Sequence, residues 1–351
     1  MKKTTQLITD IQVSQIAKGI SLLAVIMLHS LSSFFPIHTV TDNRLSFLYI
    51  LLNQFARFCV PLFLALSGFG LSRKYQNQPL NIKEFVKRKI NKLFPLYLLW
   101  SLILIFVFKL MDTWPSSGQP VWETILFGNA DYHLYYVLLI FQMYLVFLVL
   151  PMIRNNRQFL LILIFSGLIQ ALNFYVIRRF SLKDLRLNEF ILNDQTQYRL
   201  LGNWLFYFLL GAFLSRMNLD LIKTPKPIKI FLALMIGLGL AWSVFDSIWL
   251  FEKTGNIIYS TSFTRLPVMV YASGVICATL IFGSRLIYHL KLNSSLLLSI
   301  GKHSYAIYLS HTLFLRILEN IVSGEGDLVS LALSATLLVG GLSVGKLFTI
   351  G

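Results

Sequence analysis

Long apolar segments recur along the whole chain and alternate with short polar segments. A helix of about 20 such residues crosses roughly 30 Å of hydrocarbon, so the pattern predicts about ten membrane-spanning helices. The expected spans are Lys18–Phe35, Phe47–Leu71, Leu93–Met111, Leu134–Met152, Phe159–Ile177, Leu200–Ser215, Ile228–Trp249, Leu266–Phe282, Leu296–Leu318 and Leu328–Phe348. The fold class is therefore an all-α, polytopic integral membrane protein.

Three prolines lie inside or near the starts of these spans: Pro61, Pro95 and Pro267. Proline lacks a backbone N–H and clashes with the carbonyl four residues earlier, so it begins or kinks a helix. We therefore expect a helix start or a kink at each of these three positions.

The composition agrees with a membrane protein. Hydrophobic residues make up 56% of the 351 residues and charged residues only 13%, which is too little charge for the surface of a soluble protein. The net charge of +16 does not indicate nucleic acid, because the basic residues lie in short loops and no nucleic-acid-binding motif is present. We exclude nucleic acid as a partner and expect the lipid bilayer instead.

The distribution of Lys and Arg predicts the orientation. With the N-terminus inside, about twenty basic residues lie on the cytoplasmic side and about ten on the other side. We therefore expect a cytoplasmic N-terminal segment over residues 1–17, followed by one membrane domain over residues 18–348. The expected location is the cell membrane, crossed many times.

Two ionisable residues lie where the bilayer would exclude them. His29 is eleven residues after Lys18, which is about 16 Å along a helix and near mid-membrane. With an unperturbed pKa of about 6.5, a histidine there can act as a general base, or it can simply hydrogen-bond between helices. Arg57 lies in the outer half of the second span, where it either snorkels outward or holds an anionic or polar substrate.

The ninth span begins with a polar stripe. Ser304, Tyr308 and His311 are three or four residues apart and share a helix face, with Tyr305 beside them. Such a stripe indicates a lumen or a helix contact. We interpret three further polar residues, Gln142, Tyr144 and Asp246, as packing groups first.

The basic segment from Arg73 to Lys92 has two interpretations. It can anchor the topology against anionic lipids, or it can bind a donor that carries phosphates. Both can hold together. The chain has no spacing typical of a metal site, no phosphate loop and no Gly-x-Ser-x-Gly elbow, so we expect no metal and no bound cofactor.

Several segments together resemble the acyltransferase-3 family of polytopic membrane enzymes. Lys18–His29 has a basic residue, a ten-residue spacer and a histidine, and Val60–Phe69 is an apolar run that ends in Ser-Gly-Phe. Lys89–Pro95 has two basic residues and a proline, and Ile300–His311 contains Ser-Tyr, Tyr-Leu and His. Asn203–Gly211 is similar to a further family segment. The short chain looks most like the intercellular-adhesin O-succinyltransferases.

The resemblance implies an activity and roles for particular residues. It implies transfer of an acetyl or succinyl group from cytoplasmic acyl-CoA, a co-substrate, to a hydroxyl of a surface or lipid-linked carbohydrate such as an exopolysaccharide. His29 would be the base, while Ser304, Tyr305 and His311 would shape the cavity or orient His29. Lys18, Lys89 and Lys92 would bind donor phosphates, and Arg57 would face the acceptor.

The sequence departs from the family pattern at two places. Lys stands at positions 18, 89 and 92, where Arg is common. Each would therefore bind a phosphate as a point charge, without the bidentate hydrogen bonds that Arg makes. Gln142 stands near a family acidic position, so the sequence names no carboxylate partner for the histidine there.

Two other classes of function remain open. A transporter of a polysaccharide or its precursor also needs many helices and a polar midplane, although the hydropathy shows no inverted repeat. A non-catalytic subunit of the polysaccharide synthesis machinery is the other alternative, and it would tolerate the loss of His29.

Overall fold

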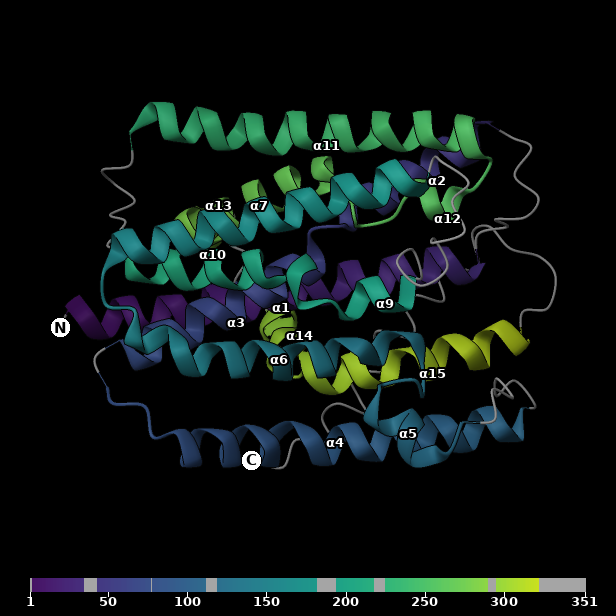
Figure 1. Cartoon of the computed structure of the whole chain (residues 1–351), viewed down its shortest axis with the longest axis horizontal. Coiled ribbons are helices and arrows are strands. Elements are labelled where there is room, and N and C mark those ends of the chain that lie inside the picture. Colours follow the sequence, from purple (N-terminus) through teal and green to yellow (C-terminus); the bar gives the residue numbers. More distant parts are fainter. Residues whose placement is uncertain are drawn as a thin grey trace. The chain divides into compact units, whose positions relative to one another are not determined.

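The fold is described from a computed structural model that covers residues 2–34, 43–76, 78–111, 119–181, 194–217, 225–289 and 295–321. All regular structure in these ranges is helical, which confirms the predicted all-α class (Figure 1). The predicted tenth span, Leu328–Phe348, lies outside the described residues.

The chain divides into two compact units. The first unit combines residues 1–69 with residues 207–351, and the second unit is residues 70–206. The first unit contains most or all of α1 (Lys2–Phe34), α2 (Asn43–Ala56), α3 (Cys59–Tyr75), α10 (Leu205–Arg216), α11 (Lys226–Thr254), α12 (Ile257–Ser260), α13 (Leu266–His289), α14 (Ser295–Lys302) and α15 (Ser304–Ile321). The second unit contains α4 (Ile82–Leu110), α5 (Val121–Leu126), α6 (Tyr135–Val149), α7 (Asn156–Ser181), α9 (Asp194–Arg199) and three short 3₁₀ turns.

Seven stretches of helix in the described part are long and apolar enough to cross a membrane. They are Asp10–Ser33, Arg44–Tyr75, Ile82–Leu110, Tyr132–Met152, Asn156–Arg178, Lys226–Thr254 and Leu266–Ser284. Each corresponds to one of the predicted spans. The sixth predicted span forms the shorter apolar helix α10, and the ninth is divided into α14 and α15.

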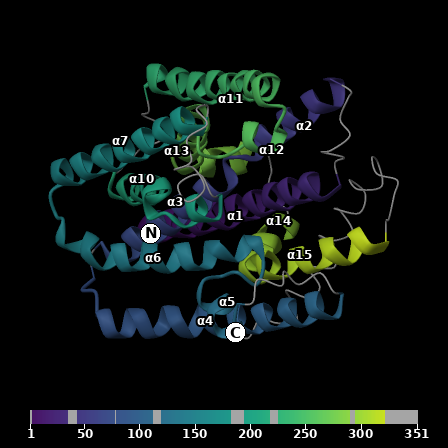
Figure 2. The same ribbon diagram turned by 45° about the vertical axis from the view of Figure 1, so that its right-hand side comes forward.

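Within the first unit, α1 packs against α13, α14 and α15, while α11 packs against α13. Figures 1 and 2 both show α11 running alongside α13. A buried apolar cluster of Tyr49, Ile50, Val244 and Ile257 joins α2, α11 and α12, and Leu31 of α1 packs against it. These contacts hold the C-terminal half of α1 beside α2.

The second predicted span is interrupted between α2 and α3, at Arg57 and Phe58. Pro61 explains the interruption, because it cannot donate a hydrogen bond to the carbonyl of Arg57 and its ring clashes with that carbonyl. The backbone tightens before the break, where the Arg57 N–H bonds to the Gln54 carbonyl at 3.2 Å. Helical bonding resumes with Leu62 N–H to the Phe58 carbonyl at 2.9 Å.

Of the other two prolines, Pro267 lies at a helix start as predicted, whereas no helix starts at Pro95. Pro267 is the second residue of α13, where a helix needs no N–H donor. Pro95 lies inside α4, so α4 lacks one hydrogen bond at that turn.

Two helix crossings depend on glycines that belong to the segments resembling the family. A Cβ at Gly19 of α1 would lie 2.7 Å from the Leu297 carbonyl of α14, and one at Gly301 would lie 1.8 Å from the Gln15 carbonyl of α1. The crossing of α3 and α10 is equally close, because a Cβ at Gly211 would lie 1.9 Å from the carbonyl oxygen of Ala65. Small residues let helix backbones approach closely, as in other membrane bundles.

Candidate functional site

His29 of α1 and His311 of α15 come together in the first unit. Their ring centroids are 5.1 Å apart and the planes are inclined by 40°. The ring of Tyr308 lies 5.6 Å from that of His311, one turn earlier on α15. The structure therefore joins two histidines that the sequence places near opposite ends of the chain.

The backbone holds His311 in one tautomer. Its Nδ1 lies 2.6 Å from the carbonyl oxygen of Tyr308, and a carbonyl can only accept a hydrogen bond. Nδ1 therefore carries the proton, and the neutral ring has its lone pair on Nε2. His311 is only 3% exposed, whereas His29 is half-buried.

Two buried hydroxyls stand next to the histidines in sequence. Ser30 Oγ and Thr312 Oγ1 are buried, and neither has a hydrogen-bond partner within the described part of the chain. A buried polar group without a protein partner normally bonds to ordered water or to a ligand. The two helices that carry the histidines therefore each carry a buried hydroxyl without a described protein partner.

Lys18 also belongs to α1, and this helix begins earlier than the sequence suggests, at Lys2. The candidate membrane span within the described part of α1 is Asp10–Ser33, which contains both Lys18 and His29. His29 lies four residues, about 6 Å along the helix, before Ser33, and its depth in the bilayer stays a prediction. The helix is continuous across the expected boundary between residues 17 and 18.

Lys18 and His29 share one face of α1. Eleven residues at about 100° each complete just over three full turns, so the two side chains leave the helix in nearly the same direction. The residues are about 16 Å apart along the axis. Lys18 is half-buried, and it adjoins the close contact between Gly19 and α14.

Ser304 and Tyr305 stand at the start of α15, and both are half-buried. Ser304 is seven residues before His311, which is about 10 Å along the helix axis. Tyr308 contacts His311 with its ring and accepts a hydrogen bond from His311 Nδ1 with its backbone carbonyl. The Ser304, Tyr308 and His311 stripe thus lies along one helix as the spacing predicts.

Arg57 lies at the interruption between α2 and α3, close to the middle of the stretch Arg44–Tyr75. Its Nε donates a hydrogen bond to Asn53 Oδ1 at 2.8 Å. The same oxygen accepts from Gln54 Nε2 at 3.3 Å. Arg57 is therefore fixed by the last turn of α2.

Gln54 connects this turn to α11 and to the loop before α13. Its Oε1 accepts hydrogen bonds from Arg265 Nη2 at 2.6 Å and from Ser243 Oγ at 2.5 Å. Arg265 Nη1 in turn lies 3.1 Å from Asp246 Oδ2, and both side chains are buried. The predicted packing role of Asp246 takes the form of a buried ion pair.

The basic residues Lys89 and Lys92 belong to the second unit. Lys89 Nζ lies 4.3 Å from the centroid of the Tyr144 ring and 5.5 Å from that of Phe85, so cation–π attraction fixes its position. Lys92 is exposed on the same helix, α4. The second weaker candidate, Gln142, donates to the Arg199 carbonyl at 3.4 Å, as expected of a packing group.

Sequence reasoning missed one pair of ionisable residues in the second unit. His133 Nδ1 lies 3.2 Å from Asp131 Oδ2, and both residues are buried at the start of the fourth span. The available signal was the Asp-x-His pattern immediately before that apolar segment. Among the described residues, no group of three His, Cys, Asp or Glu side chains has an arrangement that could hold a metal ion.

Comparison with known proteins gives one match. A family model described as an acyltransferase domain matches residues 14–345, which is nearly the whole chain and includes both histidines. No curated protein and no solved structure matches the chain.

Proposed function

The chain belongs to the acyltransferase-3 family, and on that basis we propose that it is an O-acyltransferase using cytoplasmic acyl-CoA as donor. The acceptor in this proposal is a hydroxyl of a surface or lipid-linked carbohydrate, and the acyl group is acetyl or succinyl. Family membership makes the chain a membrane acyltransferase, and its apolar helices make it a multi-pass membrane protein. The donor, the acceptor and the base are the proposed parts.

The observation that carries the proposal is the pairing of His29 with His311. Acyl transfer to an alcohol needs a base that removes the hydroxyl proton, and histidine titrates in the useful range. A second imidazole whose proton is held on Nδ1 presents an acceptor nitrogen, Nε2, and this nitrogen can orient the first ring. We assign the base to His29 and orientation to His311.

The proposed step balances without any further reagent. The acceptor oxygen attacks the thioester carbonyl carbon while His29 takes the hydroxyl proton, so a tetrahedral oxyanion forms. The carbon–sulfur bond then breaks, and the leaving thiolate takes the proton back from the imidazolium of His29. The products are the carbohydrate ester and free CoA.

We assign donor-phosphate binding to Lys18 because it lies on the same face of α1 as His29, toward the N-terminal end. Lys89 and Lys92 receive that role by the family resemblance alone. With the N-terminus inside, as the basic loops indicate, Lys18 is on the cytoplasmic side of His29. In this proposal Ser304 and Tyr305 line the path along α15 by which a substrate reaches His29. The enzyme would work in the cell membrane, together with any polysaccharide synthesis machinery.

A transporter is the second candidate, and one structural observation favours it. Two predicted spans are interrupted, one at Arg57 and one at His303, and interrupted helices with polar surroundings are common at transporter binding sites. An acyltransferase cleaves a thioester, however, whereas a carrier does not.

CoA release from acyl-CoA by the purified protein in detergent separates the two candidates. We expect release that increases with added membrane glycan and falls by roughly 10²- to 10⁴-fold in His29→Ala. His303→Ala is the matched control, since the Nδ1 of His303 only contacts the Ser299 carbonyl of its own helix region. Release that is equal in wild type and His29→Ala contradicts the base assignment, and no release by either protein favours the carrier.

A further inference from the structure

Arg57 lies at the interruption between α2 and α3, and the proposed base mechanism gives this cation no role. We propose that the guanidinium of Arg57 is a pre-positioned site for an anionic oxygen of the substrate. We further infer that Asp246 and Arg265 are positioning residues, which act on Arg57 through Gln54 and Asn53. The chemistry rests on the proposed acyl transfer, whereas the site itself rests on the geometry below.

Among the residues that the structure describes, Arg57 has no carboxylate partner. Its recorded hydrogen bond uses only Nε, and within the described ranges no carboxylate lies at ion-pairing distance from its guanidinium. Arginine keeps its proton under all physiological conditions. An uncompensated cation near the middle of a membrane-crossing segment is costly, so its retention points to a ligand of opposite charge.

The nearest carboxylate in the hydrogen-bonded network is already occupied. Asp246 pairs with Arg265 at 3.1 Å, so that pair is neutral and the network keeps one net positive charge at Arg57. Asp246, Arg265 and Gln54 are 8%, 5% and 0% exposed, respectively. The charge that remains for a ligand is therefore on the half-buried Arg57 and not on the buried pair.

The network also fixes where the guanidinium points. Arg265 is held on three sides, by Asp246, by the Ser262 carbonyl at 3.0 Å and by Gln54. Because Gln54 Oε1 accepts from Arg265, its Nε2 is turned toward the Thr261 carbonyl and Asn53 Oδ1. Asn53 then presents this oxygen to Arg57 Nε, which leaves the two Nη groups for bidentate contact with a ligand.

The start of α3 adds to the positive potential. α3 begins at Cys59, two residues after Arg57, and only Cys59 and Val60 offer an amide in its first turn, because Pro61 has no N–H and the N–H of Leu62 bonds to the Phe58 carbonyl. The partial positive charge of these two amides favours an anion at this end of the helix. The guanidinium and the start of α3 favour an anion here, whereas the last carbonyls of α2, which ends at Ala56, oppose it.

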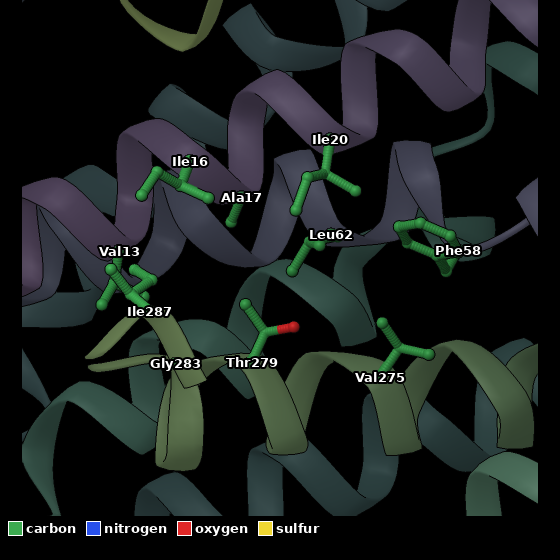
Figure 3. A pocket seen from close by; sticks show the side chains of 10 residues that line it. All are labelled: Val13, Ile16, Ala17, Ile20, Phe58, Leu62, Val275, Thr279, Gly283 and Ile287. Carbon is green, nitrogen blue, oxygen red and sulfur yellow. The ribbon is translucent and has the colours of Figure 1, made fainter. Parts of the chain in front are cut away.

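The interruption lies on the N-terminal side of His29 along α1. Phe58 shares an apolar cavity of about 170 Å³ with Leu62 and with Ile20 of α1, as Figure 3 shows. His29 is nine residues beyond Ile20, which is about 13 Å along the helix. Arg57 thus adjoins the donor side of His29 in the proposed orientation, whereas the sequence alone suggested the acceptor side.

The ligand that fits this site is an anionic oxygen, which can come from two different groups. The anionic oxygen is either a permanent charge on the donor or acceptor, or the oxyanion that forms when the thioester is attacked. A permanent anion contributes to binding before the reaction, whereas an oxyanion is stabilised only in the transition state. The kinetic constants separate the two sources.

The test measures CoA release by Arg57→Ala and Arg57→Lys over a range of acyl-CoA and glycan concentrations. A rise in the KM of one substrate in Arg57→Ala assigns a permanent anion on that substrate. A fall in kcat of roughly 100-fold with unchanged KM assigns the oxyanion. In either case methylguanidinium should restore part of the activity of Arg57→Ala. Unchanged kcat and KM in the folded variant overturn the proposal, and Arg44→Ala on the same helix α2 is the matched control.

The positioning role is tested with Asp246→Asn and Arg265→Lys. We expect each to change the same kinetic constant as Arg57→Ala, by roughly 10-fold, because the guanidinium is misplaced but still present. Ser247→Ala is the control, since Ser247 bonds only within α11, to the Ser243 carbonyl. A lower yield of folded protein with unaltered kinetic constants overturns the positioning role.

The same measurements distinguish the role of Arg57 from the base role of His29. If His29→Ala keeps full CoA release, the base assignment fails while an Arg57 effect still stands. If wild type releases no CoA, calorimetric titration with acyl-CoA or glycan still tests the site. Weaker binding of one of these by Arg57→Ala then supports a permanent anion, and equal binding of both overturns the proposal.

Discussion

The imidazole rings of His29 and His311 lie 5.1 Å apart in the first unit. One ring comes from the first membrane helix and the other from the second half of an interrupted helix near the other end of the chain. Their contact joins two of the segments that resemble the family. Gly19 and Gly301, which belong to the same two segments, lie at the close crossing of α1 and α14.

The first prediction concerns the two histidines as one unit. His311→Ala should lower acyl transfer by roughly 10- to 100-fold, because His29 loses the ring that orients it. The double variant His29→Ala/His311→Ala should be no slower than His29→Ala alone, since residues that act together are not additive. CoA release measures all three variants. Multiplicative losses in the double variant would mean that the two histidines act independently.

The second prediction concerns the crossing of α3 and α10. Gly211→Ala places a Cβ only 1.9 Å from the Ala65 carbonyl oxygen, so the helices must separate. We expect a loss of about 1–3 kcal/mol in the free energy of unfolding. Gly237→Ala is the control, because no atom lies within 4 Å of its Cβ position, and it should be neutral or slightly stabilising. Thermal unfolding in detergent compares the two, and equal melting temperatures would contradict the crossing.

The third prediction concerns the buried pair Asp131 and His133. Asp131→Asn removes the carboxylate that lies 3.2 Å from the imidazole, so we expect a loss of about 3 kcal/mol of stability. The rate per folded molecule should stay close to that of wild type, because we place the base at His29. Folded protein is quantified by size-exclusion chromatography and transfer by CoA release. A stable Asp131→Asn protein that has lost transfer would move the base to His133.

The fourth prediction concerns Lys89, which stands over the Tyr144 ring at 4.3 Å. Lys89→Ala should raise the KM for acyl-CoA by roughly 10-fold with little change in kcat, because a phosphate contact is uniform binding. Lys253→Ala is the matched control, since Lys253 also lies over an aromatic ring, that of Trp249. An unchanged KM for the donor would limit Lys89 to packing.

The sequence predicted the helical class, most spans and the effects of Pro61 and Pro267, because each depends on residues close together in the chain. Hydropathy averages over about 20 residues, so it could not separate α2 from α3 at a two-residue interruption. It also set the first span to begin at Lys18, because a basic residue usually marks a membrane boundary. In the structure Lys18 is half-buried within the longer helix α1, which begins at Lys2, so this basic residue does not mark the start of the helix.

The polar contacts of the site were harder to predict. Gln54, Asp246 and Arg265 are far apart in sequence, and only the packing of α2 on α11 makes them one network. The sequence suggested His29 and His311 separately, since each is a polar residue in an apolar helix. Their pairing required the fold, because no local pattern says which helix faces which.

The most direct test of the central claim uses sealed inverted membrane vesicles that contain the protein and the cell's glycan. Acyl-CoA labelled in the acyl group is added to the exposed cytoplasmic face, and label in the glycan is counted. The account predicts ester-linked label in wild-type vesicles and only background label with His29→Ala at equal amounts of folded protein. Equal labelling of the glycan in both preparations would contradict it.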